Sequence, residues 1–173
     1  WVIAIGNPFG LGGSVTAGVL SAHARDINAG PYDQFLQTDA SINSGNSGGP
    51  LFNTNGEVIG VNTVILSPTG GNIGIGFAVP SSVAQPVVQQ LLETGEVRRG
   101  FIGVTVQPVS EQIAEALGLE SDHGALVSDV EANAPAARAG LRAGDVILEF
   151  DGKPIREVRE LPRVVAATEI GRT

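Results

Sequence analysis

One serine within a glycine-rich segment is the place where this sequence could do chemistry. Residues 43–50 read Asn-Ser-Gly-Asn-Ser-Gly-Gly-Pro, so Ser47 has turn-forming residues on both sides. A serine nucleophile needs this setting, because a bent backbone can bring its own N–H and the N–H two residues earlier to one point. There they stabilise the oxyanion of acyl transfer. Glycine permits the necessary dihedral angles. The alternative is a glycine-rich hairpin turn without chemistry, and the pattern G-x-S-x-G alone leaves both open.

The general base that would activate Ser47 is not evident. A serine hydroxyl is a poor nucleophile until a histidine, oriented by a carboxylate, removes its proton. The chain has two histidines, His23 and His123. The order His, Asp, Ser is formally present, because Asp26 and Asp39 lie between His23 and the serine. We nevertheless interpret both histidines as loop or turn residues. Asp39 is interpreted as a structural acceptor for the backbone, with a carboxylate near the active site as the alternative.

Composition excludes several other classes of function. The 173 residues include no cysteine, which excludes thiol nucleophiles, zinc ribbons, iron–sulfur sites and disulfide scaffolds. The formal net charge of −8 argues against a nucleic-acid or anionic-membrane partner. No apolar run reaches the roughly 18 residues of a membrane helix, so we expect no membrane span. We also expect no cofactor and no metal, because serine acyl transfer requires neither. The chain lacks methionine and begins at Trp1, and we interpret it as a piece of a longer protein.

Two halves of different composition meet near residue 97. Residues 1–97 hold 16 of the 24 glycines but seven charged side chains, and the remaining residues hold 21 charged side chains. This difference predicts two domains. The first half has β-rich runs separated by turn signals, which predicts an antiparallel sandwich or barrel. These runs cover residues 2–5, 15–20, 35–37, 50–52, 58–66 and 73–79.

A helix and a small mixed module are expected to follow. Pro80-Ser81-Ser82 supplies a helix start and Gly95 a stop, although Pro86 weakens this helix unless it lies in the first turn. Beyond residue 97 the pattern predicts an α+β module. Its expected strands cover residues 101–106, 125–130 and 146–150, and its expected helices cover residues 110–117, 134–139 and 158–167.

The longer motifs resemble one known family. The sequence of residues 45–50 is similar to the nucleophile motif of chymotrypsin-like serine proteases, and its surroundings resemble the HtrA (Deg) family of serine endopeptidases. The similar segments are residues 1–10, 37–43, 56–63 and 72–80. In that family a PDZ domain follows the protease domain, and residues 101–104 and 139–147 resemble PDZ motifs.

The resemblance implies a mainly β fold. The second β-barrel of a chymotrypsin-like protease (residues 1–79) would be joined by a connecting helix or linker (residues 80–97) to an α+β PDZ domain (residues 98–173). A PDZ domain needs a closing strand after its last helix, so we expect the PDZ domain to be incomplete. We expect the chain to be truncated at both ends.

The resemblance also implies roles for individual residues around the serine. Ser47 corresponds to the acyl-forming nucleophile, and the backbone N–H groups of Gly45 and Ser47 correspond to the oxyanion hole. Ser41 stands where a trypsin-like enzyme has the aspartate of its specificity pocket, so a basic P1 residue is not expected. Apolar side chains would instead select a small or medium apolar P1 residue, with ordinary strand core as their alternative role. These side chains are Ile42, Val64, Ile65 and Leu66. The catalytic histidine and aspartate would lie upstream of Trp1.

In the second half the resemblance implies a peptide-binding site. A PDZ domain adds an extended peptide to a sheet as a strand, and loop N–H groups bind its terminal carboxylate. The implied loop and pairing strand comprise Phe101, Ile102, Gly103 and Val104. The following helix would cover the pocket with Leu161 and Val165.

Two functions remain open at this point. The leading hypothesis is an ATP-independent serine endopeptidase of protein quality control, which cuts unfolded or misfolded polypeptides through an acyl-enzyme at Ser47 and binds peptide C-termini at its PDZ domain. The alternative is a catalytically inert peptide-binding or chaperone-like module, because the base is missing. The resemblance implies a role in the stress response, a location in the periplasm or cell envelope, and a homo-trimer or larger assembly.

Overall fold

The computed structural model describes residues 1–10 and 12–172 and is mainly β with few helices. The chain divides into two compact units, Trp1–Val97 and Arg98–Thr173. The division falls where the composition changes. Among the described residues, no helix combines the length and apolar character needed to cross a membrane.

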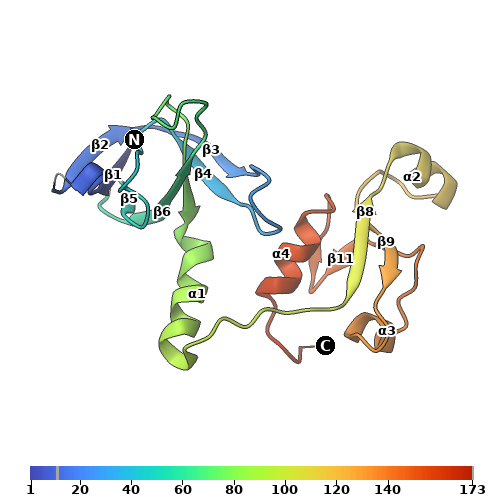
Figure 1. The fold of residues 1–173 in the computed structure, drawn as a ribbon. Coiled ribbons are helices and arrows are strands. Elements are labelled where there is room, and N and C mark those ends of the chain that lie inside the picture. The colour runs from blue at the N-terminus through green and yellow to red at the C-terminus, as the bar shows by residue number, and fades with distance from the viewer. Residues whose placement is uncertain (11, 173) are drawn as a thin grey trace. The chain divides into compact units, whose positions relative to one another are not determined.

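The first unit contains a seven-stranded antiparallel sheet (Figure 1). The strand order is β2-β1-β5-β6-β7-β4-β3. The strands are β1 (Val2–Gly6), β2 (Ser14–Gly18), β3 (Leu20–Arg25), β4 (Phe35–Thr38), β5 (Pro50–Asn53), β6 (Val58–Ile65) and β7 (Gly76–Pro80). A 3₁₀ turn, Pro8–Gly10, follows β1. Ser47 lies in the loop that joins β4 to β5.

The segment expected as one strand over residues 15–20 is two strands. β2 and β3 are separated by Val19 alone, yet they occupy opposite edges of the sheet, so the sheet curls back toward itself. Two side chains satisfy the backbone at the break. The Val19 N–H donates to Asp39 Oδ1 at 2.6 Å, and the Thr38 hydroxyl donates to the Val19 carbonyl at 2.9 Å. Asp39 is therefore an acceptor for the backbone in this structure.

Thr38→Val is expected to destabilise the chain by about 1–3 kcal/mol, because it removes the hydrogen-bond partner of the Val19 carbonyl and of the buried Ala40 N–H. Thr38 is fully buried, and its hydroxyl oxygen also accepts the N–H of Ala40 at 3.0 Å. Urea unfolding of the 173-residue chain measures the effect. Thr54→Val, in an exposed turn, is the control and should change the free energy of unfolding by less than about 0.5 kcal/mol. Equal effects of the two substitutions would contradict this account of the strand break.

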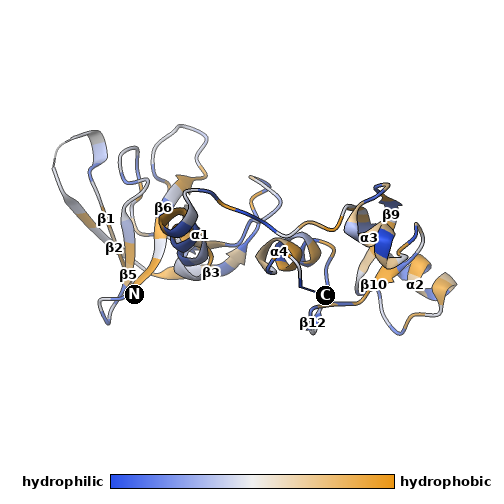
Figure 2. Cartoon of the chain, turned by 90° about the horizontal axis from the view of Figure 1, so that it is seen from below, coloured by the Kyte–Doolittle hydropathy of each residue, from blue (hydrophilic) through white to orange (hydrophobic). Residues whose placement is uncertain are grey.

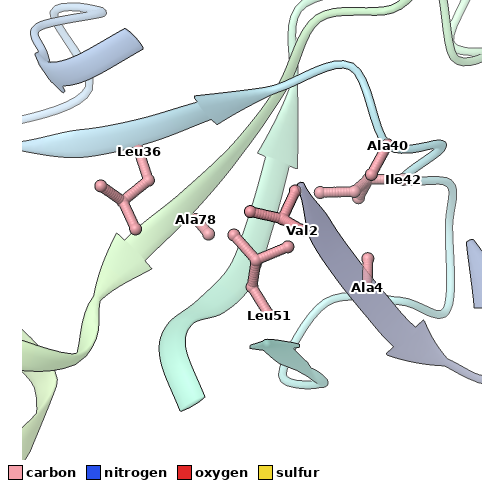
Figure 3. Close-up of a cluster of buried hydrophobic side chains, with 7 residues drawn as sticks. All are labelled: Val2, Ala4, Leu36, Ala40, Ile42, Leu51 and Ala78. Atoms are coloured by element: carbon pink, nitrogen blue, oxygen red, sulfur yellow. The ribbon is translucent and has the colours of Figure 1, made fainter. Parts of the chain in front are cut away.

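A cluster of small and medium apolar side chains forms the core of the first unit (Figure 3). Alternate residues of a strand face the same side, so Val2 and Ala4 of β1 both point into this cluster. The loop before Ser47 contributes to it as well. The buried members are Val2, Ala4, Leu36, Ala40, Ile42, Leu51 and Ala78.

The first unit ends with helix α1 (Ser81–Thr94), which packs against β6 and β7. Gly95 ends the helix in the left-handed conformation, and its N–H donates to the Leu91 carbonyl at 3.1 Å. Pro86 lies inside the helix, beyond the first turn. The helix is maintained there although proline supplies no backbone N–H.

In its described residues, 98–172, the second unit combines a three-stranded sheet, a two-stranded sheet and three helices. The sheet order β10-β9-β8 places β9 in the middle. The elements are β8 (Val104–Pro108), α2 (Glu111–Leu117), β9 (Ala125–Val130), α3 (Pro135–Ala139), β10 (Val146–Ile147), β11 (Glu149–Phe150), β12 (Lys153–Pro154) and α4 (Glu160–Ala167). The strand expected over residues 146–150 is thus two strands that pair with different partners.

Local sequence signals account for the helices of this unit. The Ser110 side chain accepts the N–H of Ile113 at 3.3 Å and so caps the start of α2, and Gly118 ends that helix in the left-handed conformation. Helix α4 buries Leu161 and Val165, four residues apart, on one face. The apolar residues of α2 and α4 are visible in Figure 2.

Candidate active site and peptide-binding loop

The turn around Ser47 is held in a conformation that depends on glycine. Gly45 has a φ of 100°, in the left-handed region, and a Cβ at this position would lie 2.9 Å from the Cα of Pro8 and would overlap the carbonyl oxygen of Asn7. The Asn7 N–H in turn donates to the Gly45 carbonyl at 3.1 Å. Asn46 is buried, whereas Ser47 is exposed. The sequence thus folds locally so that a hydroxyl faces solvent above a buried amide.

Backbone N–H groups alternate between bound and free along this turn. The Asn46 N–H donates to the Asn43 carbonyl at 3.0 Å, and the Gly48 N–H donates to the Asn62 carbonyl at 2.8 Å. Within residues 1–10 and 12–172, the N–H groups of Gly45 and Ser47 donate to no residue. Two N–H groups separated by one residue therefore remain available, which is the arrangement that can stabilise an oxyanion.

The Ser47 hydroxyl donates to the backbone carbonyl of Thr63, on β6, at 2.8 Å. In the described part of the chain it has no hydrogen bond to an imidazole. His23 is an exposed residue of β3. His123, in the second unit, lies 3.6 Å from Asp122 between Nδ1 and a carboxylate oxygen. Within the described residues, no hydrogen bond joins either histidine to Ser47. No cluster of possible metal ligands occurs among those residues.

The five residues expected to form the specificity pocket do not share one environment. Ile42 is 1% exposed and belongs to the core cluster (Figure 3). The half-buried Ile65 also packs against this cluster. Val64 and Leu66 are exposed apolar side chains. Ser41 is exposed, and its carbonyl accepts the Asn46 amide at 3.2 Å. Their role in the pocket stays a prediction.

Two asparagines that sequence reasoning did not single out connect this loop to the chain before β7. The Asn72 N–H donates to Asn43 Oδ1 at 3.1 Å, and the Asn72 amide donates to the Ile42 carbonyl at 3.3 Å. Asn72 follows Gly70-Gly71, a signal for a turn but not for this partner. Asn62 is a further asparagine without a sequence signal, and unlike Asn43 and Asn72 it is fully buried.

In the second unit, the segment expected to bind a terminal carboxylate is an open loop before β8. The N–H groups of Phe101, Ile102 and Gly103 donate to no described residue. The carbonyls of Ile102 and Gly103 point into the unit, where they accept the N–H groups of Ala136 at 2.8 Å and Glu131 at 2.9 Å. Gly103 has a φ of 74°, and a Cβ there would overlap the Cβ of Ala134. The loop therefore presents N–H groups outward and carbonyls inward.

Helix α4 lies next to this loop, because the Gly100 N–H donates to the Ala166 carbonyl at 3.4 Å. A hollow of about 470 Å³ is lined by Phe101, Ile102 and Val165 together with residues near the end of α4. Leu161 and Val165 are also core residues, 1% and 7% exposed. Val104 is half-buried at the start of β8 and packs against the same core. The structure thus brings Phe101, Ile102 and Val165 to one hollow, and Leu161 to the core.

Comparisons with known proteins agree along the chain. The family model described as "Trypsin-like peptidase domain" matches residues 1–61, and the family model described as "PDZ domain" matches residues 100–173. Among curated proteins, the chain is 56% identical over 173 residues to a probable periplasmic serine endoprotease DegP-like of Rhizobium meliloti (strain 1021), covering all of this chain and 34% of that protein. The probable periplasmic serine endoprotease DegP-like of Rickettsia prowazekii (strain Madrid E) is 51% identical over 174 residues. This match covers 98% of this chain and 34% of that protein.

Solved structures agree with the curated relatives. The chain is similar to the HtrA-type protease AlgW with tripeptide, with a TM-score of 0.88 and 46% identity over 99% of this chain and 57% of that one. It is also similar to the serine endoprotease from Yersinia pestis, with a TM-score of 0.68 and 44% identity. This match covers 99% of this chain and 54% of that one. The chain spans 34% of the length of the first curated relative. The predicted fold class, a trypsin-like β-barrel joined to a PDZ domain, is confirmed. Together, the family-model matches, the curated relatives and the solved structures support an HtrA/DegP-like fragment.

Proposed function

We propose that this chain supplies the nucleophile and the oxyanion hole of a serine endopeptidase, together with a PDZ module that binds peptide C-termini. The observation that carries the proposal is the alternation of backbone N–H groups around Ser47. Gly45 and Ser47 keep free N–H groups, while those of Asn46 and Gly48 are bound inside the protein. A plain turn has no need to leave two such donors unpaired next to an exposed hydroxyl. The names of the relatives, serine endoproteases, support the same reaction class.

The proposed reaction begins when a base removes the Ser47 hydroxyl proton. For this the hydroxyl must rotate away from the Thr63 carbonyl, to which it now donates. Ser47 Oγ then forms a bond to the carbonyl carbon of the scissile peptide, and the carbonyl oxygen becomes an oxyanion that accepts the N–H groups of Gly45 and Ser47. The C–N bond breaks, the amine leaves with the proton, and an ester at Ser47 remains. Water hydrolyses this acyl-enzyme by the same steps. We infer that the base and its carboxylate lie outside residues 1–173.

The P1 preference is proposed to be apolar. Ser41 offers no carboxylate to a lysine or arginine side chain. Val64, on β6, and Leu66, just after it, are exposed apolar side chains. Ile42 and Ile65 pack in the core. We therefore propose that they support the floor of the pocket and expose little surface to the substrate.

The PDZ module is proposed to bind an extended peptide by strand addition. Free N–H groups of residues 101–103 would take the terminal carboxylate, Val104 and the rest of β8 would pair with the peptide, and the hollow beside Phe101 and Val165 would take its last side chain. Leu161 would support that hollow from the core. The AlgW structures contain peptides, which is consistent with peptide recognition in this family.

The substrates of the whole protein are proposed to be unfolded or misfolded polypeptides in the periplasm, handled as part of protein quality control. The relatives are named as probable periplasmic enzymes. An assembly of three or more copies is proposed for the whole protein on the resemblance alone.

The fluorophosphonate reactivity of Ser47 tests the proposed reaction. In the full-length protein the probe should label Ser47 rapidly, because the base is then present. In the 173-residue chain the serine should remain unlabelled over the same time. An inert peptide-binding module is the second candidate, favoured by the hydrogen bond of the Ser47 hydroxyl to Thr63. A full-length protein that resists the probe while still binding peptides would establish that alternative.

Gly103→Ala is expected to weaken peptide binding by at least about tenfold, because the added Cβ overlaps Ala134 and the loop must move. The binding of a short fluorescent peptide ending in a free valine carboxylate measures this, with the amidated peptide as a weak-binding reference. Gly140→Ala is the control, because Gly140 has a φ of 90° but no neighbour within 4 Å of its added Cβ. If the two variants bound the peptide equally well, the loop would not be its site.

A further inference from the structure

Asn62 is a fully buried side chain in the strand beneath the nucleophile turn. It lies in β6 and is 0% exposed. A buried amide costs free energy unless it is hydrogen-bonded, so its partners indicate what it does. The Asn62 Nδ2 group donates to the carbonyl of Ile5 at 3.3 Å and to the carbonyl of Pro50 at 3.2 Å. One amide thus joins the ends of two neighbouring strands, β1 and β5, to β6.

The main chain of Asn62 holds the same turn from the other side. Its N–H donates to the Gly49 carbonyl at 2.8 Å, and its carbonyl accepts the Gly48 N–H at 2.8 Å. The next residue, Thr63, provides the carbonyl that accepts the Ser47 hydroxyl at 2.8 Å. The three residues that follow the proposed nucleophile are therefore all hydrogen-bonded to Asn62, by its backbone or its side chain.

The packing at Gly49 gives the side-chain bonds a consequence for geometry. A Cβ at Gly49 would overlap the Ile5 carbonyl oxygen, so the end of β1 lies directly against the nucleophile turn. The position of that carbonyl therefore limits where the Gly48–Gly49 backbone can lie. The Asn62 amide is the group that fixes the Ile5 carbonyl relative to Pro50. Without it, two carbonyls lose their donor and the end of β1 can shift under Ser47.

We propose that Asn62 is a positioning residue, whose side-chain amide fixes the turn so that the Ser47 hydroxyl and the two oxyanion N–H groups keep their relative placement. This inference rests on the proposed function. Asn62 does not reach the substrate, because it is fully buried. It acts through Ile5, Pro50 and the glycines that follow the serine. A displacement near 1 Å of catalytic groups can cost about 100-fold in rate, so loss of the amide should reduce turnover even in a folded protein.

Asn62→Asp in the full-length protein tests the proposal, because aspartate keeps the shape and its ionised form has no donor. Asn62→Ser is measured in parallel because it introduces no charge, so a misfolded aspartate variant does not remove the test. Fluorophosphonate titration counts the reactive Ser47 sites, and cleavage of a peptide substrate is expressed per titrated site. We expect kcat per site to fall at least about tenfold, with KM changed less than about twofold, and we expect slower labelling of Ser47.

Val2→Ala is the matched control. It removes methyl groups from the core at the other end of β1, where Val2 is 2% exposed, and it should lower the melting temperature without changing kcat per site. Variants of Asn62 that keep kcat per site within about twofold of the wild type would overturn the inference alone. A wild-type protein that the probe does not label at Ser47 would overturn the proposed function, and the inference with it.

Discussion

Ser47→Ala in the full-length protein is expected to lower the cleavage rate of casein by at least about 10⁴-fold, because the only atom that could form the acyl-enzyme is removed. The exposed position of Ser47 makes the substitution harmless to the fold. The substitution removes one hydrogen bond, from the Ser47 hydroxyl to the Thr63 carbonyl, and this bond is exposed to solvent. The measurement is the initial rate of casein cleavage at matched protein concentration, with the melting temperature as a check of folding.

Ser21→Ala provides the control for this experiment, because Ser21 is an exposed serine of β3 with no part in the proposed reaction. It should leave the cleavage rate within about twofold of the wild type, as surface substitutions usually do. Casein cleavage that survived Ser47→Ala would show that the peptidase activity resides elsewhere in the protein. Peptide binding by the PDZ module should be unaffected in both variants, which separates the two proposed functions.

Gly45→Ala should lower kcat by about 100-fold or more, a loss typical of an oxyanion hole from which one donor is removed. Two features produce this effect. The φ of 100° is unfavourable for alanine, and the added Cβ overlaps the Asn7 carbonyl oxygen. The backbone must therefore rotate, and the direction of the Gly45 N–H changes with it. The peptide cleavage rate under saturating substrate measures the change, and fluorophosphonate labelling reports whether Ser47 itself remains reactive.

Gly56→Ala separates backbone strain from the loss of the oxyanion hole. Gly56 has a φ of 80° in the turn between β5 and β6, and an added Cβ would have no neighbour within 4 Å. It should cost about 1 kcal/mol of stability and leave kcat unchanged. Comparable kcat for the Gly45 and Gly56 variants would mean that the Gly45 N–H does not act on the reacting oxygen.

Local features of this protein were predictable from its sequence because they depend on neighbouring residues. The helix start at Ser110, the helix ends at Gly95 and Gly118, and the bent turn around Ser47 each need particular residue types within a few positions. The change of composition near residue 97 likewise marks the division between the two units. The mainly β fold class followed from short apolar runs and turn signals, and from the resemblance to the HtrA family.

The environment of the pocket residues was not predictable in the same way. Ile42 and Ser41 are adjacent in the sequence, but Ile42 is 1% exposed in the core and Ser41 is exposed. Which of two neighbours faces the core is decided by how the loop after β4 packs against β1, and that strand is far away along the chain. The same holds for Leu161 and Val165, whose helical spacing indicates a common face but not what that face contacts.

By itself, the sequence determined where a reactive serine could stand, which residues bend the backbone around it, and that two β-containing domains are joined near residue 97. Only the tertiary structure decided that strand pairing breaks at Val19, that the Ser47 hydroxyl donates to Thr63, and that Asn62 holds the turn from below. The physical reason is range. Dihedral preferences and caps act over a few residues, whereas each of these hydrogen bonds joins residues separated by 12 to 57 positions that only the folded sheet brings together.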